Sequence, residues 1–259
     1  MKIQSQIMSN ADKQIHTAKF QSHVQKEVRP KLDDFPVAHL NVRGVTSKLD
    51  QIKDLLDNYN FSILGLSETF LNASKPSSFY HIHSYEMVMV VGIGRSGGGI
   101  LCYLKSGLKF EVLSHFDHML EETITIRIDF KSSCSSLICF VYRPPNSPSS
   151  WNDQLKIYLE NCTQYCNEIM ILGDFNMNLM DSKVEKRWMQ NFSKFSLSQL
   201  VTEPTPVAEN SSTLIDYIYS NRESNVKQVS VIKTSISDHY LTFAVRKIRV
   251  HKQIGKTQS

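Results

Sequence analysis

The stretch that most constrains the fold is IMILGDFN at residues 169–176. Its first four residues are apolar, a pattern that predicts a strand buried on both faces. Gly173 lets the backbone turn away where the strand ends. Asp174 and Asn176 follow two residues apart, so they point to the same side of an extended chain. Functional groups of layered α/β proteins gather at such ends, although a buried strand followed by an ordinary Asx turn would also fit this stretch alone.

Five other stretches place polar residues at the ends of predicted strands. They are HLNVRG at 39–44, GLSETF at 65–70, FVYRPPN at 140–146, LIDYIY at 214–219 and SISDHY at 235–240. Each one alone also fits a structural role, as a turn, a solvated loop or a core aromatic. Together they supply carboxylates, amides and a histidine, the groups that can align a water molecule and neutralise a phosphate.

Glu68 and Asp174 are the carboxylates with the clearest chemical roles. Glu68 follows a buried strand and is a hard oxygen ligand suited to Mg²⁺. Asn41 ends the neighbouring parallel strand and could orient the ion's water or a phosphate. Asp174 could orient or deprotonate the attacking water, and Asn176 could donate to the phosphate.

The second group of candidates surrounds a histidine. Asp238 and His239 are adjacent at the start of a predicted strand, where a flanking carboxylate can hold the imidazole in one tautomer or keep it charged. Asp216 is the acid predicted to orient His239, from an adjacent strand. Tyr142 and Asn146 could each donate a hydrogen bond to a phosphate oxygen.

This set of motifs, in this order, resembles the endonuclease/exonuclease/phosphatase superfamily, and within it the apurinic-type endonuclease domain of non-LTR retrotransposons. The resemblance runs from about Phe35 to about Lys247, and GDFN followed later by SDH is its most specific part. It implies a four-layer α/β sandwich of two packed mixed β-sheets with helices on the outer faces. It also implies a DNA substrate, Mg²⁺ as cofactor with Mn²⁺ as a substitute, and a reverse transcriptase as partner in the parent element.

The resemblance assigns roles residue by residue. The catalytic positions are Asp174, Asn176, His239, Asp216 and Tyr142; the metal positions are Glu68, Asn41 and Asp238; the phosphate or DNA contacts are Asn146, Arg43, Arg143, Ser237 and Thr205. Arg43 stands where some apurinic-type relatives have an acidic or amide residue. An arginine cannot ligate a cation, so any metal contact from that position is lost, and Arg43 could reach a phosphate instead.

The chain order predicts one α/β domain with two tails. Residues 1–34 are polar and predict a flexible N-terminal extension, residues 35–248 form the endonuclease/exonuclease/phosphatase domain, and residues 249–259 are a polar tail. Helices are predicted at 49–59, capped by Thr46 and Ser47, at 151–165 and at 184–195. Strands outnumber helices and include hairpins, which favours two packed mixed sheets. RSGGG at 95–99 leads into a strand, which favours a hairpin turn over a phosphate-binding loop.

Composition narrows the function only slightly. The net charge of +4 is compatible with a polyanionic partner, and the candidates for a basic rim are Arg43, Lys48, Arg95, Lys105 and Arg143. Five cysteines without CxxC spacing argue against a disulfide framework or a zinc site and predict a reducing compartment. No apolar run could cross a bilayer, and no signal peptide is recognisable. We therefore expect an intracellular protein that is not secreted and has no membrane partner, with nuclear access if it cuts chromosomal DNA.

Two alternatives to a DNA-nicking enzyme share the predicted fold. One is a phosphodiesterase or phosphatase that acts on small phosphoesters with the same catalytic groups. The other is a catalytically decayed domain, derived from a retroelement, that binds DNA without cutting it. Decay would strike polar site residues as readily as others, and all the expected ones are present.

Overall fold

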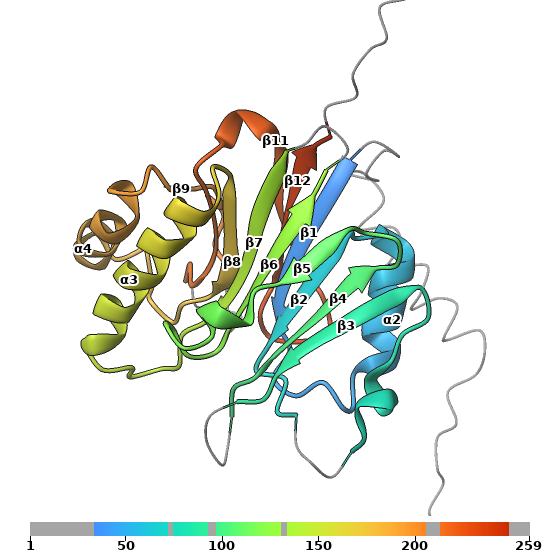
Figure 1. Cartoon of the computed structure of the whole chain (residues 1–259). Coiled ribbons are helices and arrows are strands. Elements are labelled where there is room, and N and C mark those ends of the chain that lie inside the picture. Colours follow the sequence, from blue (N-terminus) through green and yellow to red (C-terminus); the bar gives the residue numbers. More distant parts are fainter. Residues whose placement is uncertain (1–33, 72–74, 93–96, 131–133, 206–212, 249–259) are drawn as a thin grey trace, which may run out of the picture.

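The structure is a computed structural model that describes residues 34–71, 75–92, 97–130, 134–205 and 213–248. The predicted tail and nearly all of the predicted N-terminal extension lie outside this part of the chain. The described residues form two six-stranded mixed sheets packed face to face (Figure 1). Among them, no helix has both the length and the apolar character to span a membrane.

The first sheet is built around a parallel pair of central strands. Its order is β11 (Val226–Ile232), β12 (Leu241–Lys247), β1 (Asp34–Asn41), β2 (Ile63–Ser67), β4 (Ile100–Lys105) and β3 (Tyr85–Val90). β1 and β2 run parallel, as predicted, and all other neighbours are antiparallel. The β3–β4 hairpin agrees with a turn at the glycine-rich stretch, of which only residues 97–99 are described.

The second sheet repeats this arrangement. Its order is β5 (Phe110–Val112), β6 (Thr123–Asp129), β7 (Ser135–Tyr142), β8 (Ile169–Asp174), β10 (Asp216–Ser220) and β9 (Ser198–Gln199). Only β7 and β8 are parallel. β8 is the strand predicted from the IMILGD sequence, and all six of its residues are buried.

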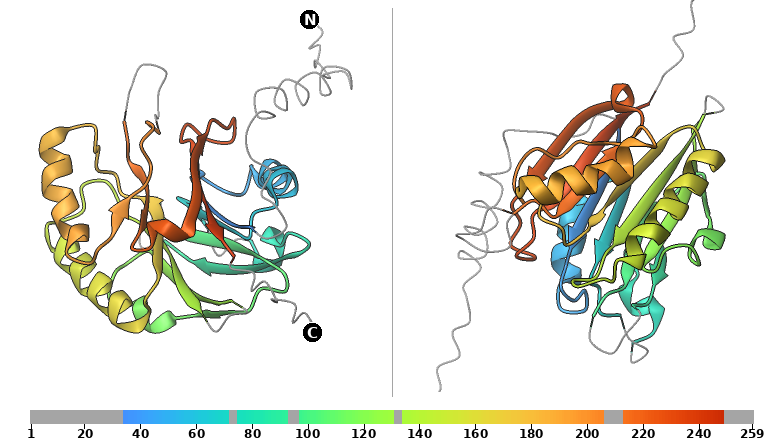
Figure 2. Two further views of the ribbon diagram at one scale, coloured as in Figure 1. Left: turned by 90° about the horizontal axis from the view of Figure 1, so that it is seen from above. Right: turned by 90° about the vertical axis from the view of Figure 1, so that its left-hand side faces the viewer.

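Helices cover the outer face of each sheet and complete the predicted four-layer α/β sandwich. α2 (Leu49–Tyr59) lies on the first sheet, and α3 (Ser150–Tyr165) and α4 (Ser182–Ser193) lie on the second (Figures 1 and 2). Short 3₁₀ turns occur at η1 (Ser77–Tyr80), η2 (Ser114–Phe116) and η3 (Glu223–Asn225).

Alternation along β1 decides which side chains face the other sheet. Ala38 and Leu40 belong to the apolar cluster under α2, whereas Val37 belongs to the larger cluster that joins the two sheets. Because side chains of a strand alternate between its faces, His39 and Asn41 share the inner face with Val37. The two polar residues therefore point into the space between the sheets.

The local sequence predictions were wrong in several details. α2 begins at Leu49 without a side-chain cap, because Lys48 occupies the N-cap position in place of the predicted Thr46 or Ser47. α4 begins two residues earlier than predicted, because the Asp181 carboxylate accepts hydrogen bonds from the first backbone N–H groups. β6 alternates apolar and polar residues, a pattern typical of a half-buried strand, yet it is buried over most of its length since both of its faces are covered. The short strands β5 and β9 were missed.

Gly173 permits close contact between β7 and β8. A methyl group at this position would lie 1.8 Å from the carbonyl oxygen of Val141, which is backbone and cannot rotate away. We expect Gly173→Ala to lower the free energy of unfolding by about 3 kcal/mol or more, as severe overpacking does. Denaturant unfolding would measure the loss. Gly107→Ala is the control, because a methyl group there meets open space; only the φ of 88° would strain it, so its loss of stability should be the smaller one. An equal loss of stability in both variants would contradict the conclusion that the contact with Val141 requires glycine at position 173.

Candidate active site

The candidate site lies where the parallel strands of both sheets end. β1 and β2 end at Asn41 and Ser67, which are register partners, and β7 and β8 end at Tyr142 and Asp174, which are also partners. The Asn41 side-chain amide donates to the Asp174 carboxylate over 2.8 Å. This hydrogen bond crosses from one sheet to the other, so four strand ends meet at one place.

Asp174 is completely buried and held by donors from both sheets. One carboxylate oxygen accepts from the backbone N–H of Asn176 at 2.9 Å. The other accepts from the amides of Asn41 at 2.8 Å and Asn176 at 3.3 Å. Asn176 reaches back because its backbone adopts a φ of 50°, and its amide also donates to the carbonyl of Arg143. The orientation of the Asp174 carboxylate is therefore fixed.

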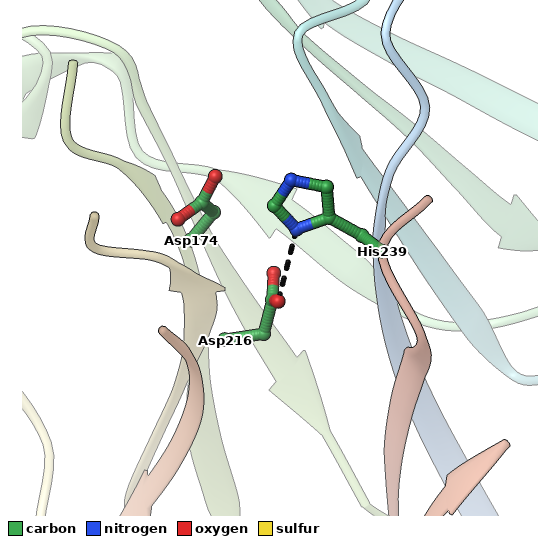
Figure 3. Close-up of side chains that lie close together, drawn as sticks. All are labelled: Asp174, Asp216 and His239. Carbon is green, nitrogen blue, oxygen red and sulfur yellow. Dashed lines mark hydrogen bonds and ion pairs between the residues drawn. The ribbon is translucent and has the colours of Figure 1, made fainter. Parts of the chain in front are cut away.

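His239 and Asp216 form the second element of the site. The imidazole Nδ1 lies 3.0 Å from a carboxylate oxygen of Asp216, and both side chains are buried (Figure 3). The predicted partnership is present, but the prediction of adjacent strands was wrong. Asp216 begins β10 in the second sheet, whereas His239 precedes β12 in the first, so the pair faces across the sandwich.

The charges of this cluster shift the pKa values of its members. Burial raises the pKa of Asp174 to about 7, and the nearby Asp216 adds to the rise, while the His239 charge and the hydrogen bonds of Asn41 and Asn176 oppose it. Burial lowers the pKa of His239, but the hydrogen bond and charge of Asp216 more than offset that effect and raise it to about 9. A carboxylate that titrates near neutrality suits a general base.

Glu68 joins the same site through Tyr142. The tyrosine hydroxyl donates to the Glu68 carboxylate over 3.0 Å, and Tyr142 is the register partner of Asp174. Burial, followed by the charge of Glu68, raises the pKa of Tyr142 far above its ordinary value, so its hydroxyl remains a donor. Glu68, Asp174 and His239 thus converge, as the predicted chemistry requires.

Asp238 and Arg43 form an ion pair at the solvent side of the site. Their closest atoms are 2.7 Å apart, and the side chains are 34% and 48% exposed. Ser237 donates to Asp238 and accepts from the backbone N–H of His239, so it shapes this turn. Lys48 lies close by, with its ammonium group on the carbonyl of Val42. The metal role predicted for Asp238 stays a prediction, since its carboxylate is engaged by a guanidinium here.

Two of the predicted phosphate contacts are buried, and one predicted rim residue lies at the far end of β2. Arg143 is buried, and its guanidinium supports the loops at Phe175 and Ser147. Thr205 is completely buried, and its hydroxyl accepts from the backbone at the start of β10. Lys105 is paired in register with Tyr85, and its backbone contacts Ser62, at the opposite end of β2 from Glu68.

The remaining two candidates have different outcomes. Asn146 is exposed in the loop after β7 with a φ of 59°, where it remains a candidate phosphate contact. Arg95 lies outside the described residues.

His39 is a site residue that the sequence reading missed. Its Nε2 lies 3.0 Å from the Ser67 hydroxyl, and its Nδ1 lies 3.8 Å from Asp216. Burial lowers the pKa of His39 to about 4, against the charge of Asp216, so the ring is neutral. The spacing of His39 and Asn41, two residues apart on one strand, was the available signal, because such side chains share a face.

The side-chain oxygens of the candidate site are suitable ligands for a hard divalent cation. Within the described residues, one carboxylate oxygen each of Asp174 and Asp216 and a ring nitrogen of His239 lie within 4.8 Å of one another. Glu68 and Asn41 add further side-chain oxygens nearby, whereas His239, with its raised pKa, is charged at neutral pH and is a neighbour of the cation site and not a ligand. One carboxylate oxygen of Asp216 is buried without a hydrogen-bond partner. Several buried carboxylates in one place leave negative charge that a cation would neutralise.

A model of the endonuclease/exonuclease/phosphatase family matches residues 38–239, and the chain belongs to this family. Its members hydrolyse phosphoester bonds and typically use divalent metal ions. A comparison with curated protein sequences finds no match.

Solved structures share the fold at low sequence identity. The catalytic domain of Xenopus laevis APE2 is 17% identical, with a TM-score of 0.65 over 84% of this chain and 94% of that one. A 3'-5' exonuclease, NExo, from Neisseria meningitidis is 19% identical, with a TM-score of 0.63 over 81% and 98%. The endonuclease domain of TRAS1, a telomere-specific non-LTR retrotransposon, is 14% identical, with a TM-score of 0.62 over 84% and 100%. These likenesses establish the fold alone.

Proposed function

We propose that the protein is a Mg²⁺-dependent DNA endonuclease that leaves a nick with a 3′-hydroxyl and a 5′-phosphate. The observation that carries the proposal is the convergence of Glu68, Asp174 and His239, from three separate parts of the chain, at one edge of the sandwich. In a parent retroelement the 3′-hydroxyl would prime a reverse transcriptase, and the protein would need access to the nucleus.

Asp174 accepts the proton of the attacking water in this mechanism. Water attacks phosphorus, the bond from phosphorus to the 3′ oxygen breaks, and the departing oxygen gains a proton to become the 3′-hydroxyl. Asn41 and Asn176 hold the Asp174 carboxylate in place for the proton transfer. His239 is charged at neutral pH because Asp216 raises its pKa, so it opposes the negative charge that builds up on the phosphate.

Asn146 and Tyr142, whose hydroxyl donates to Glu68 in this structure, are the further phosphate contacts of the proposal, and Arg43, which is paired with Asp238 in this structure, adds a positive charge at the rim. Mg²⁺, held by Glu68 and Asn41 with Asp238 as the further predicted ligand, would supply Lewis-acid neutralisation of the phosphate oxygens. Mn²⁺ would be accepted as a substitute because it takes the same oxygen ligands.

DNA is preferred as substrate over small phosphoesters for two reasons. Arg43 and Lys48 place positive charge beside the site, as a polyanion requires. Among proteins of this fold, one is a retrotransposon endonuclease domain and the Neisseria NExo enzyme has been solved bound to a DNA hairpin product. A small-phosphoester enzyme of the same fold is the alternative, and it would need no cationic rim.

Incubation with supercoiled plasmid tests the proposal. We expect open circles to form in reactions with Mg²⁺ and not to form in reactions with EDTA. The reason is that the clustered carboxylates cannot act on a phosphate without a cation to neutralise them. Gel electrophoresis reads the result, and a chromogenic small phosphodiester in the same buffers tests the alternative. Hydrolysis of the small ester without plasmid nicking, or no metal-dependent hydrolysis of either, would contradict the proposal.

A further inference from the structure

One aromatic side chain stands exposed at the edge of the candidate site. Phe70 is 40% exposed and follows Glu68 by only two residues. Two residues span at most about 7 Å of chain, so the backbone of Phe70 lies close to that of Glu68, beside the candidate phosphate site.

The backbone beneath this ring is held in an unfavourable conformation. Phe70 has a φ of 51°, which is rare for a bulky residue, and Glu68 has a φ of 49°. The backbone N–H of Phe70 donates to the carbonyl of Gly98 at 3.1 Å, and Thr69 is bonded on both sides, to Gly99 and Val45. Neighbouring segments therefore impose this conformation, and such local strain clusters at binding sites.

Two glycines lie beside the ring of Phe70. A methyl group added to Gly44 would lie 3.4 Å from the ring, and one added to Gly97 would lie 3.7 Å from it. The ring thus rests against the backbone of the loop that carries Arg43 and against the glycine-rich loop after β3. Glu122, itself at a φ of 53°, accepts from the backbone N–H of Gly99 at 3.1 Å and steadies that loop.

We propose that the exposed face of Phe70 is a stacking platform for a nucleobase adjacent to the scissile phosphate. A rigidly held aromatic ring beside a phosphate site, with Arg43 two residues along from Asn41 on the neighbouring loop, combines the two parts of nucleic-acid binding, base stacking and phosphate attraction. A small phosphoester without a base would gain nothing from the ring. The inference rests on the proposed function and assigns a polynucleotide as the substrate class.

If a base stacks on Phe70, the affinity for DNA should depend on the aromatic ring. Removing one aromatic platform weakens nucleic-acid binding by about 5- to 150-fold. The test measures the Kd of short DNA duplexes that carry 2-aminopurine, placed in turn at successive positions, with the full chain in EDTA. We expect the 2-aminopurine emission to change on binding at one position in the wild type. We expect Phe70→Ala to lose both this emission change and this factor in Kd, Phe70→Leu to lose the emission change, and Phe70→Trp to keep both.

Tyr165→Ala is the matched control. Tyr165 is 42% exposed and ends α3, next to Cys166, which contacts the beginning of β7 at the edge opposite the site. Thermal unfolding confirms that each variant is folded. A Phe70→Ala protein that binds within twofold of the wild type, or an equal loss in Tyr165→Ala, would overturn the inference.

The binding measurement in EDTA also separates this inference from the proposed activity. Duplex binding with a Phe70-dependent change in emission, but without plasmid nicking, would support the platform and contradict the endonuclease. Nicking that is indifferent to Phe70 would do the reverse, and a wild type that neither binds the duplexes in EDTA nor nicks plasmid in Mg²⁺ would overturn both.

Discussion

Replacing Asp174 with asparagine is expected to lower the rate of plasmid nicking by about 10²- to 10⁴-fold, the usual contribution of general acid–base catalysis. The amide keeps the size of the carboxylate but cannot accept a proton from water. The pKa of about 7 that burial gives Asp174 makes the loss large, because this carboxylate is poised for proton transfer at neutral pH. Initial rates on supercoiled plasmid at saturating Mg²⁺ would measure it.

The stability of this variant provides an internal check. Burial raises the pKa of Asp174, so the charged carboxylate is costly to bury, and its removal should not unfold the protein. Glu168→Gln is the control variant, because Glu168 is a partly buried carboxylate paired with Arg246 at the other edge of the sandwich. That change should lower stability and leave nicking intact at temperatures where the protein remains folded. An Asp174→Asn protein that nicks at the wild-type rate would remove Asp174 from the mechanism.

The architecture could be predicted from the sequence because its signals are local. Apolar runs such as residues 169–172 in β8 and the helical spacing in α2 are set by the period of each element. Motifs at strand ends then identified the site, since parallel strands bring their carboxyl ends to one edge. β5 and β9 escaped prediction because three and two residues carry too little pattern to read.

The orientation of side chains could not be predicted, because it depends on how the two sheets pack. Arg143 follows β7, the strand of the FVYRPPN motif, yet it is buried beneath the loops. Its guanidinium lies over the ring of Trp151 from α3. Lys105 ends a strand that runs antiparallel to β2, which carries it away from Glu68. The partnership of Asp216 with His239 was predicted from residue types, but only the tertiary structure shows that it crosses between the sheets.

Replacing Asp216 with asparagine is expected to lower the pKa of His239 from about 9 by about one to three units, the effect of losing one close opposite charge. The burial that lowers the pKa of this histidine is then no longer offset. NMR titration of the His239 ring in metal-free protein would measure the shift. Asp238→Asn is the matched control, since the Asp238 charge is the smallest contribution to the same pKa, and its loss should move it less.

The same pair controls stability in alkaline solution. His239 has a pKa of about 9 in the folded protein and 6.5 as its ordinary value, so the folded state binds the proton more tightly. The stabilisation by the ion pair is complete below pH 6.5 and is lost as the pH rises through 9. Asp174, whose pKa is also raised, changes stability in the same direction but at lower pH.

The free energy of unfolding of metal-free wild type should therefore fall between pH 6.5 and 9, and that fall should be smaller in Asp216→Asn. A His239 that titrates alike in both proteins would mean that Asp216 does not keep the imidazole charged, and the proposed role of this histidine against the phosphate would have no basis.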